Sequence, residues 1–364
     1  MSTKGRAAIY VEPRQPLIVD EVEFADPGPD QVLVKLFASG ICHSQLHTMQ
    51  RPARPGHRLP ALLGHESTGV VVAKGREVKH VHEGDHVITT WVDRDNATTY
   101  QPMVMHALNE RAQYLARWKG REVMHSAATW AEYAVAQERV VVPLPKDMAT
   151  DVTSIIGCAV MTGAGAIVNT LQVRPGQSVA VFGAGGIGLC AISAAAIVDA
   201  HPVIAVDVNE SKLDFARRFG ATHGINAESS DPVQAIKELT AGGVDFALDA
   251  IGLPSTQEQI LRAVRPGFSG LNKGGTALLI GITPPDAKAV LDTSLFAGNR
   301  SFTRTSGGDC KPDRDFPIFF RWVREGKLQL DELVTARYRL DQINQAVDDL
   351  EHGRILGRGI LTLS

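Results

Sequence analysis

Two cysteines and one histidine, far apart in the chain, carry side chains that bind soft metal ions. Cys42 lies in a Gly-Ile-Cys-His-Ser motif, His65 in Gly-His-Glu, and Cys158 in Ile-Gly-Cys. Each residue alone means little, because a lone cysteine is more often a buried apolar side chain. Together they form a Cys₂His set, and catalytic zinc in proteins has three such ligands and one open position. The set predicts a catalytic zinc site.

A glycine-rich motif later in the chain has the pattern that holds the phosphates of a dinucleotide. The apolar run Ser178–Phe182 is followed by G-x-G-x-x-G, which contains Gly183, Gly185, Gly186, Ile187 and Gly188. In this pattern the glycines allow a tight turn, close approach to a pyrophosphate and close packing of helix on strand. The free N–H groups of the following helix bind phosphate. By itself the motif is also compatible with an ordinary glycine-rich turn.

An acidic residue strengthens the dinucleotide interpretation. Asp207 ends the next apolar run, about twenty residues after the glycines, where an acid binds the ribose hydroxyls and repels a 2′-phosphate. We therefore expect dinucleotide binding, with NAD favoured over NADP. Lys212 either reaches the same ribose or is a solvated helix charge.

The elements that must position these residues follow two different patterns. Most of residues 1–90 and 129–145 form short β-rich runs bounded by Gly, Pro or Asp, typical of an antiparallel barrel or sandwich. Between them, Glu110–Lys119 has helix-forming composition. From about residue 151 to 300, strand-length apolar runs alternate with helix-length segments, which predicts a parallel sheet covered on both faces. In the tail we expect helices at 316–325 and 340–351 and a strand at 359–363.

Composition excludes several classes of protein. The 364 residues suggest two domains, and 37 Lys and Arg against 40 Asp and Glu give a net charge of −3, unlike a nucleic-acid binder. Four cysteines make no disulfide framework, which favours a reducing compartment. The first ten residues lack an apolar signal region, and the longest apolar run, Leu189–Val198, is about half a membrane span. We expect a cytoplasmic protein with no nucleic-acid or membrane partner.

Taken in order, these motifs resemble those of the zinc-dependent medium-chain alcohol dehydrogenase family over nearly the whole chain. Gly357-Arg-Gly-Ile-Leu-Thr near the C-terminus adds to the resemblance. It implies an α/β fold with two domains. Residues 1–155 and 301–364 would form a GroES-like, β-rich catalytic domain. Residues 156–300 would form an inserted Rossmann domain, whose doubly wound parallel sheet binds NAD. It also implies hydride transfer between an alcohol and NAD, giving an aldehyde or a ketone.

The resemblance assigns roles to further residues. Ser44 resembles the hydroxyl that forms a hydrogen bond with the alcohol, and His47 resembles the outer end of a proton relay. Glu66 resembles an acid near the metal. Thr162 resembles a residue near the nicotinamide, and Arg358 resembles a cation that binds the pyrophosphate. Trp91, Trp130 and Ile282 fall where family members place substrate-pocket side chains. Plainer interpretations stay open: His47 as a surface histidine, Arg358 as a structural ion-pair partner, and the pocket residues as core.

Three departures from the family pattern carry expectations of their own. Gln45 stands where most relatives have an Asp that orients the histidine ligand. Gln can accept the same hydrogen bond but carries no charge, so we expect His65 to be oriented but less polarised than it would be by Asp. His43 replaces an Arg beside the pyrophosphate, which predicts NAD affinity that weakens between about pH 6 and 8.

The third departure concerns a second metal. The region from Asp93 to His125 contains no cysteine, and Asp95 and His106 add no recognisable ligand spacing, whereas many relatives hold a structural zinc there. We expect one catalytic zinc per chain and no structural zinc. Tyr114, Leu115 and Trp118, packed inward from the expected helix, would replace it.

Two indoles in the expected pocket favour primary alcohols that are aromatic, allylic or of medium length. The alternatives are a polyol or glutathione-adduct formaldehyde dehydrogenase of the same family, a zinc-free quinone or enone reductase, and a non-catalytic NAD-binding structural protein. The resemblance further implies a homodimer or homotetramer joined through edge strands around residues 276–300.

Overall fold

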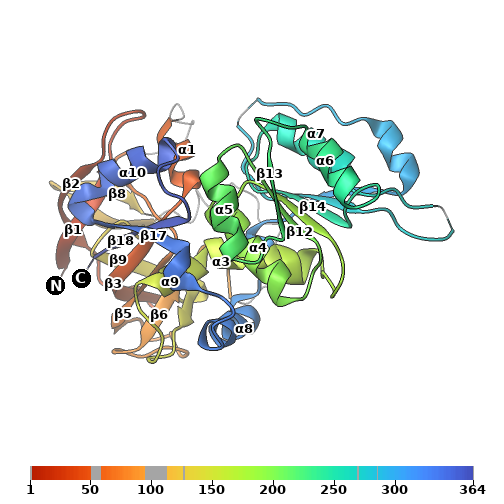
Figure 1. Ribbon diagram of the computed structural model, residues 1–364. Coiled ribbons are helices and arrows are strands. Elements are labelled where there is room, and N and C mark those ends of the chain that lie inside the picture. The colour runs from red at the N-terminus through yellow and green to blue at the C-terminus, as the bar shows by residue number, and fades with distance from the viewer. Residues whose placement is uncertain are drawn as a thin grey trace. The chain divides into compact units, whose positions relative to one another are not determined.

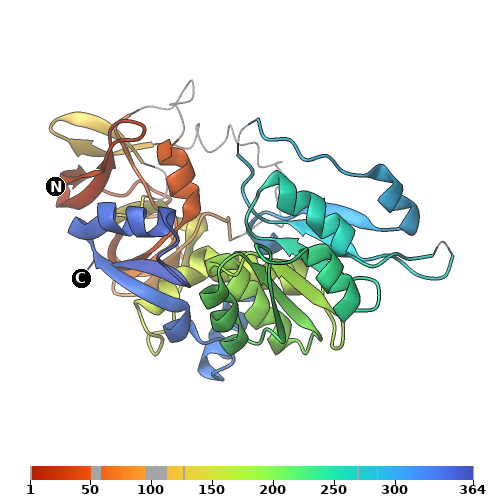
Figure 2. The same cartoon turned by 45° about the horizontal axis from the view of Figure 1, so that its top comes forward.

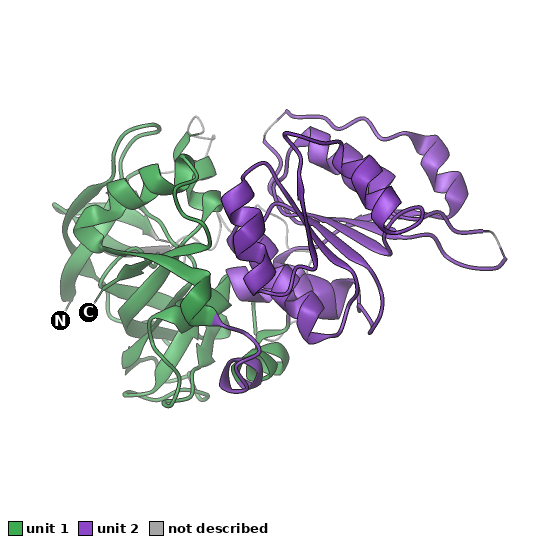
Figure 3. Ribbon diagram, viewed as in Figure 1, with its two compact units in different colours: residues 1–158, 311–320, 330–364 green, residues 159–310, 321–329 purple. Residues whose placement is uncertain are grey.

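The computed structural model describes residues 2–50, 59–94, 113–125, 128–268, 270–284 and 286–363. The chain forms two compact units, each built from separate stretches of sequence (Figure 3). Unit 1 contains Met1–Cys158, Lys311–Phe320 and Leu330–Ser364, and unit 2 contains Ala159–Cys310 and Arg321–Gln329. Cys42, His65 and Cys158 all belong to unit 1, whereas the glycine motif belongs to unit 2.

Unit 1 consists mainly of strands (Figure 1). A closed barrel contains, in order, β1 (Thr3–Tyr10), β2 (Ile18–Phe24), β7 (Gln113–Trp118), β8 (Arg121–His125) and β4 (Ala61–Leu62). A second sheet has the order β10 (Val141–Pro143), β6 (His86–Thr89), β5 (Ser67–Lys74), β3 (Gln31–Ile41), β18 (Arg358–Thr362) and β17 (Val334–Arg339), and β9 (Tyr133–Gln137) also pairs with β3. Because β18 pairs antiparallel with β3, the C-terminal segment completes a sheet that begins near the N-terminus.

The barrel corrects the helix expected over Glu110–Lys119. Residues 113–118 form strand β7, which pairs with both β2 and β8. Lys119 (φ 49°) and Gly120 (φ 74°) make the turn into β8, and positive φ at both positions is what a tight hairpin turn requires. Helix propensity is a weak preference that sheet pairing overrides. Trp118 is buried in the barrel core, while residues 95–112 and the side chain of Tyr114 lie outside the described residues.

Unit 2 is a parallel sheet with the strand order β13, β12, β11, β14, β15, β16. Its strands are β11 (Val179–Phe182), β12 (Val203–Asp207), β13 (His223–Asn226), β14 (Phe246–Asp249), β15 (Thr276–Leu279) and β16 (Ser301–Arg304). This is the doubly wound order of dinucleotide-binding domains. β16 pairs in register with β15, so the parallel pattern continues beyond residue 300.

Helices connect and cover these strands (Figure 2). In unit 2 they are α3 (Ala159–Gly165), α4 (Gly186–Ile197), α5 (Glu210–Arg218), α6 (Pro232–Leu239) and α7 (Pro254–Ala263), with short helical turns η3 (Ala166–Thr170), η4 (Thr293–Gly298) and η5 (Gly307–Asp309). α3 packs on α4, and α6 packs on α7. The apolar residues of the central strands β11 and β12 are buried because helices cover the sheet, which explains their runs of apolar sequence.

The remaining helices complete unit 1 and the tail. They are α1 (His43–Gln50), α9 (Leu330–Leu333), α10 (Ile343–Glu351), the turns η1 (Glu138–Val140), η2 (Val152–Gly157) and η6 (Leu340–Gln342), and α8 (Pro312–Arg324), which begins in unit 1 and ends in unit 2. Among the described residues, no helix has the length and apolar character needed to cross a membrane. All four cysteines lie in the described ranges, and none of them forms a disulfide.

Candidate active site

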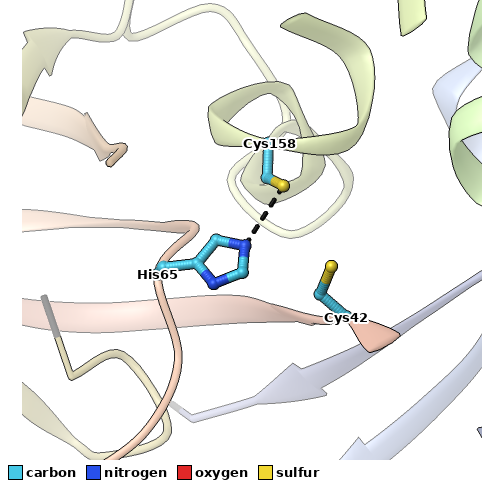
Figure 4. A group of neighbouring side chains, drawn as sticks. All are labelled: Cys42, His65 and Cys158. Carbon is cyan, nitrogen blue, oxygen red and sulfur yellow. Dashed lines mark hydrogen bonds between the residues drawn. The ribbon is translucent and has the colours of Figure 1, made fainter. Parts of the chain in front are cut away.

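Three segments of unit 1 bring Cys42, His65 and Cys158 together (Figure 4). Cys42 lies between β3 and α1, His65 lies between β4 and β5, and Cys158 follows η2. Their ligand atoms all lie within 4.8 Å of one another, and His65 Nε2 is 3.1 Å from Cys158 Sγ. Both cysteines are buried and the histidine is half-buried. Zinc bonds of about 2.0–2.3 Å to nitrogen and sulfur fit a triangle of this size with small side-chain adjustments.

The electrostatics of the two thiols also suit a cation. A hydrogen bond from Cys158, supported by the charge of Arg358, holds the pKa of Cys42 well below its usual range. The same hydrogen bond and burial raise the pKa of Cys158 well above its usual range. Two buried sulfurs this close to each other form a site at which a divalent cation can displace the thiol protons and stabilise both thiolates.

Gln45 contacts the outer nitrogen of the histidine ligand. Its side-chain amide meets His65 Nδ1, which leaves Nε2 facing Cys158. A histidine that ligates through Nε2 carries its proton on Nδ1 and needs an acceptor there. The buried Gln45 Oε1 has no hydrogen-bond partner within the ranges that the structure describes, and turning the amide over presents this oxygen to the Nδ1–H group. Gln45 therefore lies where it can orient His65 without adding a charge.

Helix α1 carries the residues expected to move a proton. The buried hydroxyl oxygen of Ser44 has no hydrogen-bond partner in the described parts of the chain, which suits a contact with a ligand. His47 is half-buried one helical turn later, and His43 is exposed at the start of the helix. The predicted contacts of His43 with a pyrophosphate and of His47 with a proton relay stay predictions.

A buried ion pair lies next to the ligands. Arg358, on β18, pairs with the carboxylate of Glu66, and both side chains are almost completely buried. Burial raises the pKa of Glu66. Burial alone would lower the pKa of Arg358, but the charges of Glu66 and Cys42 raise it well above its usual range. These contacts match the ion-pair alternative for Arg358, and its predicted pyrophosphate contact stays a prediction.

The three residues expected to line a substrate pocket have different surroundings. Trp91 lies beside the metal ligands, since its ring centroid is 6.5 Å from that of His65 in an edge-on arrangement. Trp130 is 1% exposed in a hydrophobic core, and its indole donates to the carbonyl of Gly40, so it packs as a core residue. Ile282 follows β15 in unit 2 and is 41% exposed.

In unit 2 the glycine motif forms the turn between β11 and the first turn of α4. Gly183 has φ +97°, which favours glycine. A Cβ on Gly188 would overlap the carbonyl oxygen of Gly183, whereas one on Gly185 would meet nothing within 4 Å. Gly186 and Ile187 occupy the first turn of α4, whose N–H groups are free to bind phosphate.

Asp207 reaches the same turn from the end of β12. Its Oδ2 accepts a hydrogen bond from Ala184 N–H at 2.8 Å, and its Oδ1 accepts one from Asn209 N–H at 3.1 Å. A carboxylate has about four acceptor positions, so ribose hydroxyls can still bind. Lys212 is half-buried in the first turn of the neighbouring helix α5.

Three buried side-chain oxygens of unit 2, those of Thr162, Ser193 and Asp249, have no hydrogen-bond partner among the described residues. The hydroxyl of Thr162, on α3, suits the contact expected for it. Asp249 Oδ2 was not predicted. Asp249 ends β14 beside Phe182 of β11, its other oxygen accepts from Ile251 and Gly252 N–H, and burial raises its pKa. The available signal was an acid at the end of an apolar run, the same signal that identifies Asp207.

The expected absence of a structural zinc concerns the acidic and histidine side chains of residues 93–125. Asp93 forms an ion pair with Arg139, 3.4 Å apart. Asp95, His106 and the side chain of His125 lie outside the described residues. Within the described ranges, the Cys42–His65–Cys158 group alone has three metal-binding side chains close enough to share one ion. The prediction of a single zinc therefore stays a prediction.

Comparison with known proteins places both units in one family. A model described as alcohol dehydrogenase GroES-like domain matches residues 28–146, and one described as zinc-binding dehydrogenase matches residues 186–325. Curated relatives include geraniol dehydrogenase of Castellaniella defragrans, 31% identical over 97% of this chain and 96% of that protein. S-(hydroxymethyl)glutathione dehydrogenase of Photobacterium damsela subsp. piscicida is 32% identical over 96% of this chain and 98% of that protein.

Solved structures give the same result. An alcohol dehydrogenase zinc-binding domain protein from Burkholderia ambifaria is 34% identical, with a TM-score of 0.92 and coverage of 100% of both chains. Benzyl alcohol dehydrogenase from Acinetobacter calcoaceticus is 30% identical, with a TM-score of 0.87 and coverage of 100% of both chains.

Proposed function

The chain belongs to the zinc-dependent medium-chain alcohol dehydrogenase family, and we propose that it uses NAD to oxidise primary alcohols that are aromatic, allylic or of medium length. The convergence of Cys42, His65 and Cys158 carries the proposal. Two thiolates and one imidazole balance the charge of Zn²⁺ and leave a fourth position for the substrate oxygen.

The residues around the triad have different proposed roles. Zinc held there would supply Lewis-acid polarisation of the alcohol oxygen, and NAD would accept the hydride. Ser44, whose buried hydroxyl has no partner among the described residues, would accept the alcohol proton and release its own hydroxyl proton. His47, further along α1, would take up the released proton and pass it outward. Gln45 holds His65 through its outer nitrogen.

The turn between β11 and α4 is the proposed NAD site. Gly183 to Gly188 approach the pyrophosphate with backbone N–H groups, and Asp207 binds the adenosine ribose. The carboxylate of Asp207 repels a 2′-phosphate, so NAD is preferred over NADP. Thr162 offers a buried, unpartnered hydroxyl for the nicotinamide end.

The substrate class follows from Trp91 and from the relatives. Its ring packs edge-on near His65, which places an aromatic wall beside the metal ligands. Two of the similar proteins are a geraniol dehydrogenase and a benzyl alcohol dehydrogenase, named for an allylic and an aromatic alcohol. A glutathione adduct is the second candidate, because one relative is an S-(hydroxymethyl)glutathione dehydrogenase.

A substrate panel with metal analysis tests the proposal. We expect one zinc per chain, NAD reduction with benzyl alcohol and geraniol, and little with glycerol or S-hydroxymethylglutathione. Equal kcat/KM for benzyl alcohol and glycerol contradicts the substrate class. Activity that survives removal of zinc contradicts the mechanism and favours a quinone or enone reductase, and NAD binding without any turnover favours a non-catalytic protein.

We propose that the enzyme works as a homodimer or homotetramer in the reducing cytoplasm. β16 is an edge strand of the parallel sheet, and an exposed edge can pair with a second copy. Light scattering should give the mass of two or four chains, and Thr303→Lys on β16 should lower it. A monomeric mass for the unaltered protein contradicts this assembly.

A further inference from the structure

Thr90 connects the end of β6 to the segment that carries Cys158. It is fully buried, and its hydroxyl donates a 2.7 Å hydrogen bond to the carbonyl of Gly157, the residue directly before Cys158. The same oxygen accepts a long hydrogen bond, 3.4 Å, from Val92 N–H. A hydroxyl has one proton, and in this bond Thr90 donates it to the Gly157 carbonyl.

The backbone of Gly157 also abuts β6 directly. A Cβ on Gly157 would lie 2.5 Å from the carbonyl oxygen of Thr89 and 3.4 Å from Cβ of Glu66. Cys158 itself has φ −144° and ψ −65°, values of neither a helix nor a strand, because it separates η2 from α3. Contacts of the preceding residue therefore help to fix the backbone that carries its thiol.

The other side of the triad is held more redundantly. The carbonyl of Glu66, the residue after His65, accepts hydrogen bonds from Gly40 N–H at 3.1 Å, Ser39 Oγ at 2.9 Å and Thr129 Oγ1 at 3.3 Å. Loss of one donor there leaves two in place. By contrast, in the described parts of the chain the Gly157 carbonyl accepts a side-chain hydrogen bond from Thr90 alone.

We propose that Thr90 is a positioning residue of the metal site, whose hydroxyl fixes Cys158 Sγ relative to Cys42 and His65 by holding the Gly157 carbonyl. This inference rests on one part of the proposed function, namely that the triad binds a metal ion. Zinc–sulfur bonds are about 2.3 Å long and sites tolerate displacements of only about 0.5 Å, so loss of this hydrogen bond should weaken binding. Neighbours that orient metal ligands typically contribute about 10–100-fold in metal affinity or activity.

Cobalt binding to the full-length, metal-free protein tests this role without turnover. Co²⁺ reports its thiolate ligands through absorption, and its affinity follows from competition with a chelator. Thr90→Val removes the hydroxyl and keeps the shape, Thr90→Ser keeps the hydroxyl, and Thr153→Val is the matched control. Thr153 is equally buried in η2, but its hydroxyl donates to the carbonyl of Ala149.

We expect Thr90→Val to lower Co²⁺ affinity about 10-fold or more and to alter the thiolate absorption, while Thr90→Ser restores both. Thr153→Val should keep the affinity and spectrum of the unaltered protein even if it unfolds at a lower temperature. Unchanged affinity and spectrum in Thr90→Val overturn the inference, as does an equal loss in Thr153→Val. If Thr90→Val does not fold, Thr90→Ala gives the same comparison. Failure of the unaltered protein to bind Co²⁺ contradicts the proposed metal site itself.

Discussion

The metal-binding triad of unit 1 and the glycine turn of unit 2 are assembled in opposite ways. Cys42, His65 and Cys158 come from three separate segments, and buried hydrogen bonds and an ion pair surround them. Gly183 to Gly188 are consecutive, and their turn depends on glycine backbone conformation, with one side-chain hydrogen bond from Ala184 N–H to Asp207. The triad therefore depends mainly on tertiary contacts, whereas the turn depends mainly on positions that lack a side chain.

This difference predicts how each site fails. A substitution that breaks a long-range contact should damage metal binding and leave dinucleotide binding intact. A substitution that adds a side chain to the glycine turn should do the reverse. The following variants test this separation.

The largest effect is expected from a ligand. Cys158→Ser should abolish stoichiometric zinc and lower kcat/KM by about 10³-fold or more, because Lewis-acid stabilisation contributes several kcal/mol at about 1.36 kcal/mol per tenfold. Metal analysis, steady-state kinetics and NAD titration measure this, and NAD affinity should stay the same. Cys310→Ser, which removes another buried thiol, is the control. Full zinc content and full activity in Cys158→Ser would exclude this residue as a ligand.

Next in size is the loss of the buried ion pair. Glu66→Gln leaves the Arg358 charge uncompensated, so the free energy of unfolding of the metal-free protein should fall by about 3–5 kcal/mol. Chemical denaturation measures it. The exposed pair Lys4–Glu21 provides the control, since Glu21→Gln should cost at most about 1 kcal/mol. Equal costs for the two variants would mean that burial of the first pair has no energetic consequence.

A smaller effect is expected in the glycine turn. Gly188→Ala forces a Cβ against the carbonyl of Gly183, and such overpacking costs about 1–3 kcal/mol, or about 10–100-fold in NAD affinity if the turn opens. Gly185→Ala meets no protein atom, so it should keep thermal stability and weaken only NAD binding. NAD titration and metal analysis separate the two sites. Loss of zinc in either variant would show that the sites are not independent.

The smallest effect concerns the orientation of His65. Gln45→Asp supplies a charged acceptor for the Nδ1 proton and should raise metal affinity by up to about 10-fold, while Gln45→Ala should lower it. Chelator competition measures both. If Gln45→Asp and Gln45→Ala bind metal as the unaltered protein does, the contact with His65 has no part in metal retention.

Sequence reasoning was most successful where the signal was local. The helix expected near residues 316–325 is present as α8, and the C-terminal strand is present as β18. It failed for β7, because composition favoured a helix and pairing with β2 and β8 decided the outcome. Trp130 likewise matched a pocket position in sequence, yet its indole packs in the core.

The amino-acid sequence by itself indicated the chemistry of this protein: a Cys₂His ligand set from residue types in three short motifs, and a phosphate-binding turn with an acid for the ribose from residue type and short spacing. Tertiary structure alone decided which buried groups support that chemistry. Arg358 meets Glu66, and Thr90 meets the carbonyl before Cys158, across strands and turns that are distant in sequence. No local pattern encodes such contacts, since they exist only when the sheets of unit 1 have closed.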